Sequence, residues 1–195
     1  MDEALAAELV ALAEEDQRVR AELLAEGTLF DGYNPRMEEV HVRNAARLTE
    51  ILDAHGWPGR ALVGEEGSRA AFMIVQHAIS RPSLQRRALP LLEDAAARGE
   101  VDPVQVAYLD DRIRTHEGRG QRYATQFDWD EQGELSPLPL DDPDGVEARR
   151  ASVGLEPLDE KLRQMRSDMQ GEKPPADWAE RRREIDAWAR SVGWR

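Results

Sequence analysis

The apolar residues recur at helical spacing along most of the chain. From Leu5 they follow at intervals of three and four, interrupted at Asp16, which predicts a first helix that ends near Gly27. Further helices are expected over these approximate ranges: 36–54, 82–97, 104–116, 143–153, 157–169 and 178–192. A loop that begins at Trp57-Pro58 leads into another helix, whose centre from Ala70 to Val75 is apolar on every side. A helix of that kind is expected to be buried.

A short β-element is expected after the fifth helix. Residues 122–127, RYATQF, alternate aromatic with small or polar side chains, and LSPLPL, 135–140, is the expected hairpin partner. The fold class that these patterns predict is mainly α: a compact helical domain with about seven or eight helices and one small β-hairpin. The helix breaker GEKPP divides the chain into a helical domain with a polar interior cluster, 1–170, and an appended C-terminal helix, 171–195.

The composition narrows the class of protein. With 41% hydrophobic and 33% charged residues, the chain is too apolar for a disordered protein and too charged for a membrane protein. Its apolar runs are far shorter than the ~20 residues of a membrane span, and its acidic first residues do not resemble an export signal. We therefore expect a cytoplasmic protein without membrane contact. A net charge of -13 argues against nucleic acid as a partner, and the lack of cysteine excludes thiolate chemistry.

The most informative polar residues are Gln76 and His77, which directly follow the all-apolar stretch. A buried polar side chain is costly unless it is hydrogen-bonded, so both are expected to have partners in the protein, in water or in a ligand. For an isolated histidine, a structural role is the favoured interpretation. The alternative is a proton carrier, because imidazole titrates near neutral pH.

A second polar group lies on the fifth predicted helix. Asp110, Asp111 and Arg112 fall where full solvation of all three is not expected, because apolar residues occupy both sides of this helix. A structural ion pair is favoured, and the alternative is that Asp111 orients a histidine while Arg112 holds a carboxylate. The two buried helices are expected to pack together and to bring His77 near this segment.

A third group occupies residues 121–126. Gln121, Tyr123, Thr125 and Gln126 form either a polar edge strand or a pocket wall of neutral hydrogen-bonding groups. Asp16 interrupts the first apolar stripe, and Arg20, four residues further on, suits an ion pair with it.

Metal binding is not expected from the spacing of the histidines. His41, His55, His77 and His116 include no pair four residues apart, so neither a metal nor another cofactor is predicted, although one histidine joined by carboxylates stays open. The chain also lacks the glycine-rich phosphate loop, the nucleophile elbow and the HExxH zinc motif.

Several short motifs, in order, resemble an uncharacterised bacterial family, a domain of unknown function. They are GWP at 56–58, VG at 63–64, QHA at 76–78, LDDRI at 109–113 and QRYATQ at 121–126. One departure is Ala124, which stands where the family pattern has a glycine, and alanine resists a positive φ. The resemblance implies no reaction. It places five candidates inside shared motifs: His77, Asp111, Arg112, Gln121 and Gln126.

Two functions follow from these observations. The first is a small enzyme that acts on a polar metabolite by acid–base chemistry, as a hydrolase, lyase or cyclase, with His77 as acid or base. In that hypothesis Asp111 orients His77, and the substrate is bound by Gln76, Arg112, Gln121, Tyr123 and Gln126. The alternative is a non-catalytic acidic protein of binding or immunity type, with a basic protein as its partner. The sequence does not specify an oligomeric state.

Overall fold

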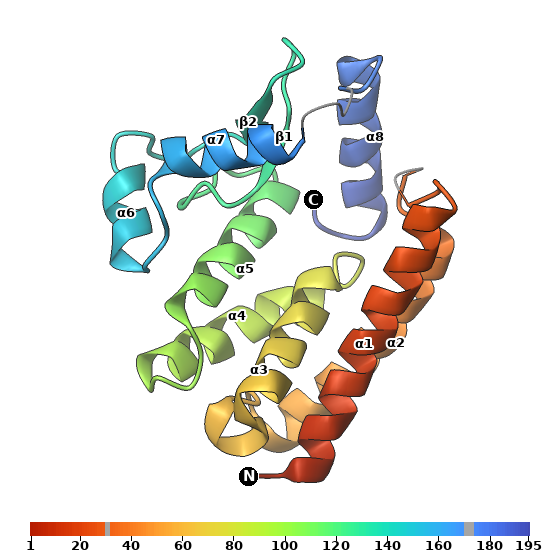
Figure 1. Ribbon diagram of the computed structural model, residues 1–195, viewed down its shortest axis with the longest axis vertical. Helices are drawn as coiled ribbons and strands as arrows, with labels where there is room; N and C mark the ends of the chain where they lie inside the picture. Colours follow the sequence, from red (N-terminus) through yellow and green to blue (C-terminus); the bar gives the residue numbers. More distant parts are fainter. Residues whose placement is uncertain (30–31, 170–173) are drawn as a thin grey trace. The chain divides into compact units, whose positions relative to one another are not determined.

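The computed structural model describes residues 1–29, 32–169 and 174–195. Within them lie eight helices and one antiparallel two-stranded hairpin, which confirms the predicted fold class (Figure 1). The chain forms two compact units, Met1–Asp102 and Pro103–Arg195. The predicted boundary after residue 170 lies outside the described residues, and the division at that point stays a prediction. Among the helices of the described ranges, none combines the length and apolar composition of a bilayer span.

The first unit consists of four helices that match the predicted ranges closely. They are α1 (Glu3–Ala25), α2 (Pro35–His55), α3 (Arg60–His77) and α4 (Pro82–Ala97). Local signals set their ends, because Asn34 caps α2 through the backbone of Arg36 and Gly56 ends the same helix at a φ of 69°. Helix α3 packs on α1 and α2, most extensively on α1.

Two glycines of α3 allow this packing. Gly64 takes a φ of 70° at a kink inside the helix, a conformation that other residues rarely adopt. One turn later, a Cβ atom on Gly67 would meet Val63 at 2.8 Å and the Cα atom of Ala6 at 3.3 Å. The backbones of α1 and α3 therefore approach closely at this point. The predicted burial of the α3 centre is confirmed at Ala70, which is 6% exposed, and along the buried face that follows it.

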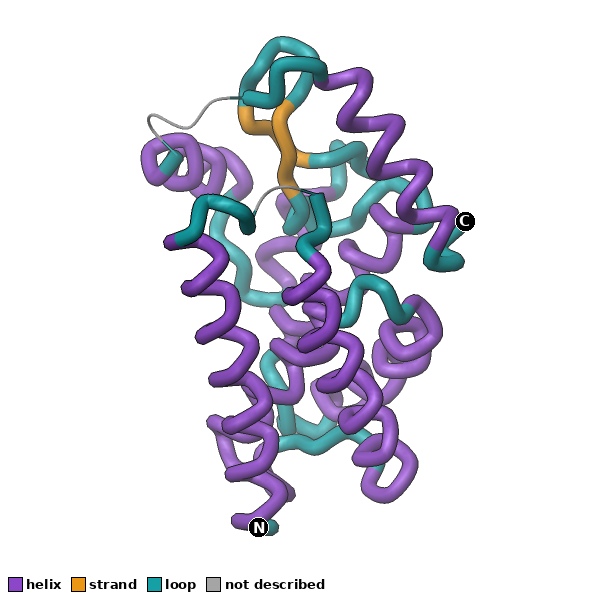
Figure 2. Tube along the Cα trace, turned by 90° about the vertical axis from the view of Figure 1, so that its right-hand side faces the viewer, coloured by secondary structure: helices purple, strands orange, loops and turns teal. Residues whose placement is uncertain are grey.

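The second unit has a small hairpin between helices. Its elements are α5 (Pro103–His116), β1 (Phe127–Trp129), β2 (Leu135–Pro137), α6 (Val146–Ser152), α7 (Leu158–Asp168) and α8 (Trp178–Ser191). Figure 2 shows the two strands in orange, and their register pairs Phe127 with Pro137 and Trp129 with Leu135. Helix α7 lies against β2, where the Arg166 guanidinium donates to the Leu135 carbonyl.

Helix α8 is held on the second unit by aromatic residues. The indole of Trp178 donates to the Trp129 carbonyl over 2.8 Å. At the other end, the imidazole of His116 lies 5.5 Å from the ring of Trp188 and 5.1 Å from that of Trp194, measured between centroids. Trp194 is only 3% exposed.

The predicted strand over 122–127 is wrong for most of its length, since β1 begins only at Phe127. The backbone N–H groups of Arg122, Tyr123 and Thr125 donate to the side chain of Asp111 and not to a neighbouring strand. A side chain from a preceding helix thus replaces the partner strand that the alternating pattern predicts.

Candidate functional site

Asp16, His41 and His77 converge from three helices of the first unit. The Oδ2 atom of Asp16 lies 2.9 Å from Nδ1 of His77 and 3.1 Å from Nε2 of His41. Each residue offers one potential ligand atom, and these three atoms lie within 4.8 Å of one another. One carboxylate and two imidazoles therefore meet at a single point.

A buried asparagine sets the register of α1 against α2. Asn44 is 0% exposed, and its Nδ2 donates to the carbonyl of Leu12 over 3.0 Å. Leu12 precedes Asp16 by four residues, and Asn44 follows His41 by three, so the bond lies about one helical turn from the site on each helix. It holds His41 opposite Asp16.

A buried glutamine fixes the end of α3. The last carbonyl groups of a helix lack partners within the helix. Here Gln85 of α4, 0% exposed, donates its Nε2 to the carbonyls of Val75 and Gln76 at 2.7 and 3.2 Å. His77, the last residue of α3, is held in place by this cap.

The carboxylate of Asp16 stays ionised. Its burial to 1% exposure raises its pKa, but the close contacts with His41 and His77 outweigh this and hold the pKa well below its usual range. Its second oxygen, Oδ1, accepts a hydrogen bond of 3.3 Å from Nε2 of Gln17. The Oδ2 atom thus carries negative charge toward the two imidazoles.

His41 is held by Tyr33 on its other side. The Tyr33 hydroxyl and Nδ1 of His41 share a hydrogen bond of 2.7 Å, and burial raises the pKa of Tyr33, so the hydroxyl keeps its proton. Nε2 of His41 is buried and has no hydrogen-bond partner among the described residues, although Asp16 Oδ2 is 3.1 Å away. The distance suits a hydrogen bond, and the direction of the N–H group does not.

These groups open onto a pocket of about 190 Å³. Its described walls are Asp16, Arg20, Leu29, Gly32, Tyr33, Asn34, Met37, His41 and His77. The side chain of His77 is 28% exposed, which leaves it accessible to a small molecule. The expected ion pair between Asp16 and Arg20 is absent from the described residues, because the histidines occupy the Asp16 carboxylate.

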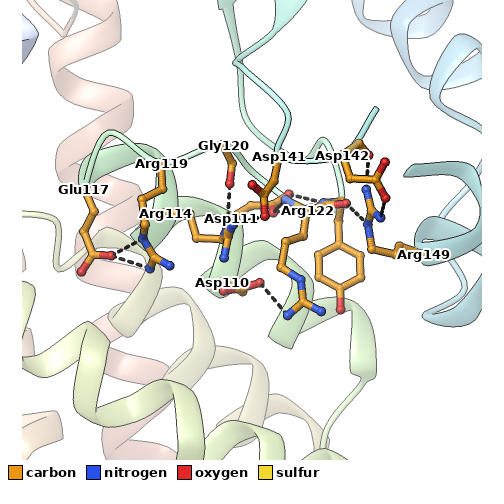
Figure 3. Close-up of polar contacts among 11 residues, drawn as sticks. Asp110, Asp111, Arg114, Glu117, Arg119, Gly120, Arg122, Asp141, Asp142 and Arg149 are labelled. Atoms are coloured by element: carbon orange, nitrogen blue, oxygen red, sulfur yellow. Dashed lines mark hydrogen bonds and ion pairs between the residues drawn. The ribbon is translucent and has the colours of Figure 1, made fainter. Parts of the chain in front are cut away.

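The second predicted group, on α5, forms a loop anchor and not a second pocket. Asp111 is 0% exposed and accepts from the N–H groups of Arg122, Tyr123 and Thr125 and from the Thr125 hydroxyl, at distances from 2.6 to 3.2 Å. Figure 3 shows Asp111 beside Arg122, together with the ion pair between Asp110 and Arg122. Asp111 thus anchors the 121–126 loop, and both of its oxygens are engaged in doing so.

The other loop residues bond to the loop itself. The amide of Gln121 donates to the carbonyls of Gln126 and Leu138 and accepts from the Gln126 N–H, while Arg150 donates to the carbonyls of Tyr123 and Ala124. The side chain of Gln126 donates to the Thr125 hydroxyl.

The remaining predicted residues are distributed between the two units. Gln76 is 6% exposed in the first unit, and burial lowers the pKa of Arg112 to about 10 in the second. The expected contact between His77 and the segment from Asp110 to Arg112 would join the two units, and it stays a prediction. Within its own unit, His77 contacts Asp16.

Sequence reasoning singled out His77 but missed its partners. Asp16 was assigned to an ion pair and His41 to no site, although the position of each residue in the sequence indicated burial. Asp16 occupies an apolar position of the first stripe, and His41 and Asn44 lie on the buried face of α2 together with Val40. Polar residues on the buried faces of two helices indicate a shared polar centre, since each requires a partner.

Comparison with known proteins adds one finding. A family model matches residues 3–174, and that family is described as one of unknown function. The predicted resemblance to an uncharacterised family is confirmed by this match. No curated protein and no solved structure matches the chain.

Proposed function

The chain belongs to this family, DUF6624, and we propose that it is a small cytoplasmic enzyme that acts on a polar metabolite with a divalent metal ion held by Asp16, His41 and His77. One observation carries the proposal: three ligand groups from three helices converge on the wall of a pocket. Sequence spacing argued against a metal, but such spacing does not limit ligands drawn from separate helices.

The distances in the cluster support a metal ion. Ligands bonded at about 2.0–2.2 Å to one ion lie about 3 Å apart when they are neighbours in its coordination sphere. The Asp16 oxygen is 2.9 and 3.1 Å from the two imidazole nitrogens. A metal ion also provides the partner that the buried Nε2 of His41 lacks among the described residues.

The surrounding hydrogen bonds suit this arrangement. Histidines that bind metals commonly donate their other N–H to a neighbouring oxygen, which fixes the ring and its tautomer. If Nε2 of His41 held the ion, Nδ1 would carry the proton and would donate it to the Tyr33 hydroxyl, 2.7 Å away. Gln17 likewise bonds the Asp16 oxygen that faces away from the histidines.

The donor set selects the metal. Two imidazoles and one carboxylate suit zinc, iron(II), cobalt(II) or nickel(II), whereas magnesium and calcium prefer oxygen ligands. Three protein ligands leave room in the coordination sphere for water or substrate, as catalytic sites require. Such an ion would lower the pKa of a bound water to about 7 and so would supply the acid–base chemistry of a hydrolase, lyase or cyclase. His77 keeps its central place, as a ligand rather than a proton carrier.

The first experiment measures metal binding. Protein stripped with a chelator is titrated calorimetrically with zinc, cobalt(II) and magnesium. We expect one equivalent of zinc or cobalt per chain and no specific binding of magnesium. Asp16→Asn and His41→Gln should lose the transition-metal site, and His55→Gln, at an exposed histidine of α2, should keep it. Failure of wild-type protein to bind either transition metal would contradict the proposal.

The second experiment seeks the substrate. Metal-loaded protein is screened by thermal shift against a panel of polar metabolites, since a ligand at a hundred times its dissociation constant adds about 2.7 kcal/mol of stability. Compounds that bind are then tested for turnover. We expect turnover only with the metal bound, and none in Asp16→Asn.

A further inference from the structure

Arg20 is the one arginine or lysine among the described walls of the pocket at the proposed metal centre. It lies on α1 four residues after Asp16, so the two Cα atoms are about 6 Å apart along the helix axis, and it lines the same pocket. No acidic partner of Arg20 occurs among the described residues, although the chain carries a net charge of -13. The position therefore offers an unneutralised guanidinium beside the site.

This contrasts with most arginines of the same unit. The following form ion pairs with glutamate or aspartate: Arg18, Arg36, Arg43, Arg47, Arg60, Arg69 and Arg87. An arginine four residues after an aspartate on a helix would ordinarily pair with it. At Arg20 this pairing is lost because the carboxylate of Asp16 faces the two histidines.

We propose that Arg20 binds an anionic oxygen group, a carboxylate or a phosphate, of the substrate; this inference rests on the proposed function and names its substrate class. Guanidinium recognises both groups through paired hydrogen bonds. The anion would lie about one helical turn from the metal ligands, with the reacting bond between them. The pocket of about 190 Å³ has room for a small metabolite.

The amide of Asn34, which also lines the pocket, already has hydrogen-bond partners within the protein. Asn34 accepts from the Arg36 N–H and donates to the Thr28 carbonyl, so its amide caps α2 and closes the preceding turn. The wall also contains Leu29 and Met37, which suit an apolar part of a ligand. Arg20 is thus the positively charged group of the described wall.

The test uses inorganic phosphate and acetate as separate probes. Calorimetric titrations compare wild type, Arg20→Gln and Arg20→Lys, each in the cobalt(II)-loaded and in the metal-free state. Arg98→Gln, at an exposed arginine after α4 that does not line the pocket, is the matched control. We expect one probe to bind wild type at least about tenfold more tightly than Arg20→Gln, with Arg20→Lys intermediate and the control unchanged.

Metal and anion binding are read out separately. Arg20→Gln should bind cobalt(II) as wild type does, because Arg20 is not a ligand. Equal anion affinity in wild type and Arg20→Gln, or no binding of either probe, would overturn the inference while leaving the metal proposal intact. Absence of cobalt binding would defeat the proposed function, and the metal-free titrations would still decide whether Arg20 binds an anion. Preference for phosphate over acetate, or the reverse, identifies the substrate's anionic group.

Discussion

The Oδ2 atom of Asp16 lies 2.9 Å from Nδ1 of His77, although 61 residues separate them in the sequence. The contact joins the middle of α1 to the last residue of α3, on the helix pair with the most extensive packing in the first unit. Close approach at Gly67 and the Gln85 cap bring these two side chains within bonding distance. The chemistry at this point thus depends on packing between helices more than on any local motif.

Replacing Asp16 by asparagine removes the negative charge from the centre of the cluster. We expect a loss of transition-metal affinity of more than about 100-fold, because a neutral amide oxygen is a poor substitute for an ionised carboxylate. Calorimetric titration with zinc measures it. Asp53→Asn, at an exposed aspartate of α2 that pairs with Arg87, is the matched control and should bind zinc normally. Unchanged zinc affinity in Asp16→Asn would exclude Asp16 as a ligand.

Replacing Tyr33 by phenylalanine tests the support of His41. The ring can still pack on the apolar cluster that includes Leu23 and Met37, but the 2.7 Å hydrogen bond to Nδ1 is lost. Removal of such a partner typically weakens metal affinity about 10–100-fold. Competition of the variant with a chromogenic zinc chelator measures the change. Tyr108→Phe, in the second unit, should not alter the affinity, and an equal loss in both variants would contradict a positioning role for Tyr33.

Replacing His77 by glutamine separates a functional from a structural histidine. Glutamine can keep a hydrogen bond to Asp16 but is a weak metal ligand, so we expect metal binding and any turnover to be lost while the metal-free protein stays folded. A structural histidine would instead show a stability loss of roughly 1–3 kcal/mol with activity retained. Zinc titration, turnover and melting temperature on this variant and on His55→Gln distinguish the two outcomes.

The helices were predictable because local signals specify them. Helix α4 was expected over 82–97 and is found at Pro82–Ala97, since proline and the apolar stripe both act within a few residues. The strand predicted over 122–127 was wrong for most of its length, because the N–H groups of this segment donate to Asp111, 11 to 14 residues earlier, and no local pattern shows that. At Ala124 the sequence did carry a signal, since this residue stands where the family pattern has a glycine. Its φ of 54° is the sole positive value outside glycine in the described residues.

The site was predictable only in part. His77 stood out because it follows an apolar stretch, and burial of its neighbours is a local property. Its partners come from α1 and α2, and no period or spacing reveals which faces of these helices meet. The buried polar positions Asp16, His41 and Asn44 carried that information, but only when read together as residues that must satisfy one another.

Replacing Asp111 by asparagine tests its role as a loop anchor. An amide nitrogen would face backbone N–H groups that now donate to a carboxylate, and the residue is 0% exposed. We expect a loss of roughly 2–4 kcal/mol in the stability of the second unit, with zinc affinity unchanged. Urea unfolding followed by tryptophan fluorescence measures it. Asp141→Asn changes the exposed partner of an ion pair with the mostly buried Arg114, which also donates to the Gly120 carbonyl, and should cost less than about 1 kcal/mol. Unchanged stability in Asp111→Asn would contradict the anchoring role and would favour the catalytic role first considered for Asp111.

A buried histidine also makes the second unit sensitive to pH. Burial, together with the guanidinium groups of Arg112 and Arg195, lowers the pKa of His116 to about 4 from an ordinary 6.5. The charge of Arg195 is shared with Asp186, 2.7 Å away, and the rings of Trp188 and Trp194 cover the imidazole. The folded protein therefore resists protonation at this position over a range where the unfolded chain accepts a proton.

This difference in pKa between the folded and unfolded states makes the protein less stable in acid. Between pH 6.5 and about 4 the unfolded state binds the additional proton, so the free energy of unfolding falls as the pH falls, and below about pH 4 this contribution stops growing. From pH 7 to pH 5 we expect a loss of roughly 1–2 kcal/mol from His116, after allowance for its partial exposure. In His116→Phe the ring still stacks on both tryptophans, but this loss should disappear, whereas His55→Gln should retain it. Urea unfolding at both pH values, followed by the fluorescence of the adjacent tryptophans, gives the comparison. An equal loss of stability in wild type and His116→Phe would show that other groups cause the acid sensitivity of the helix α8 contact.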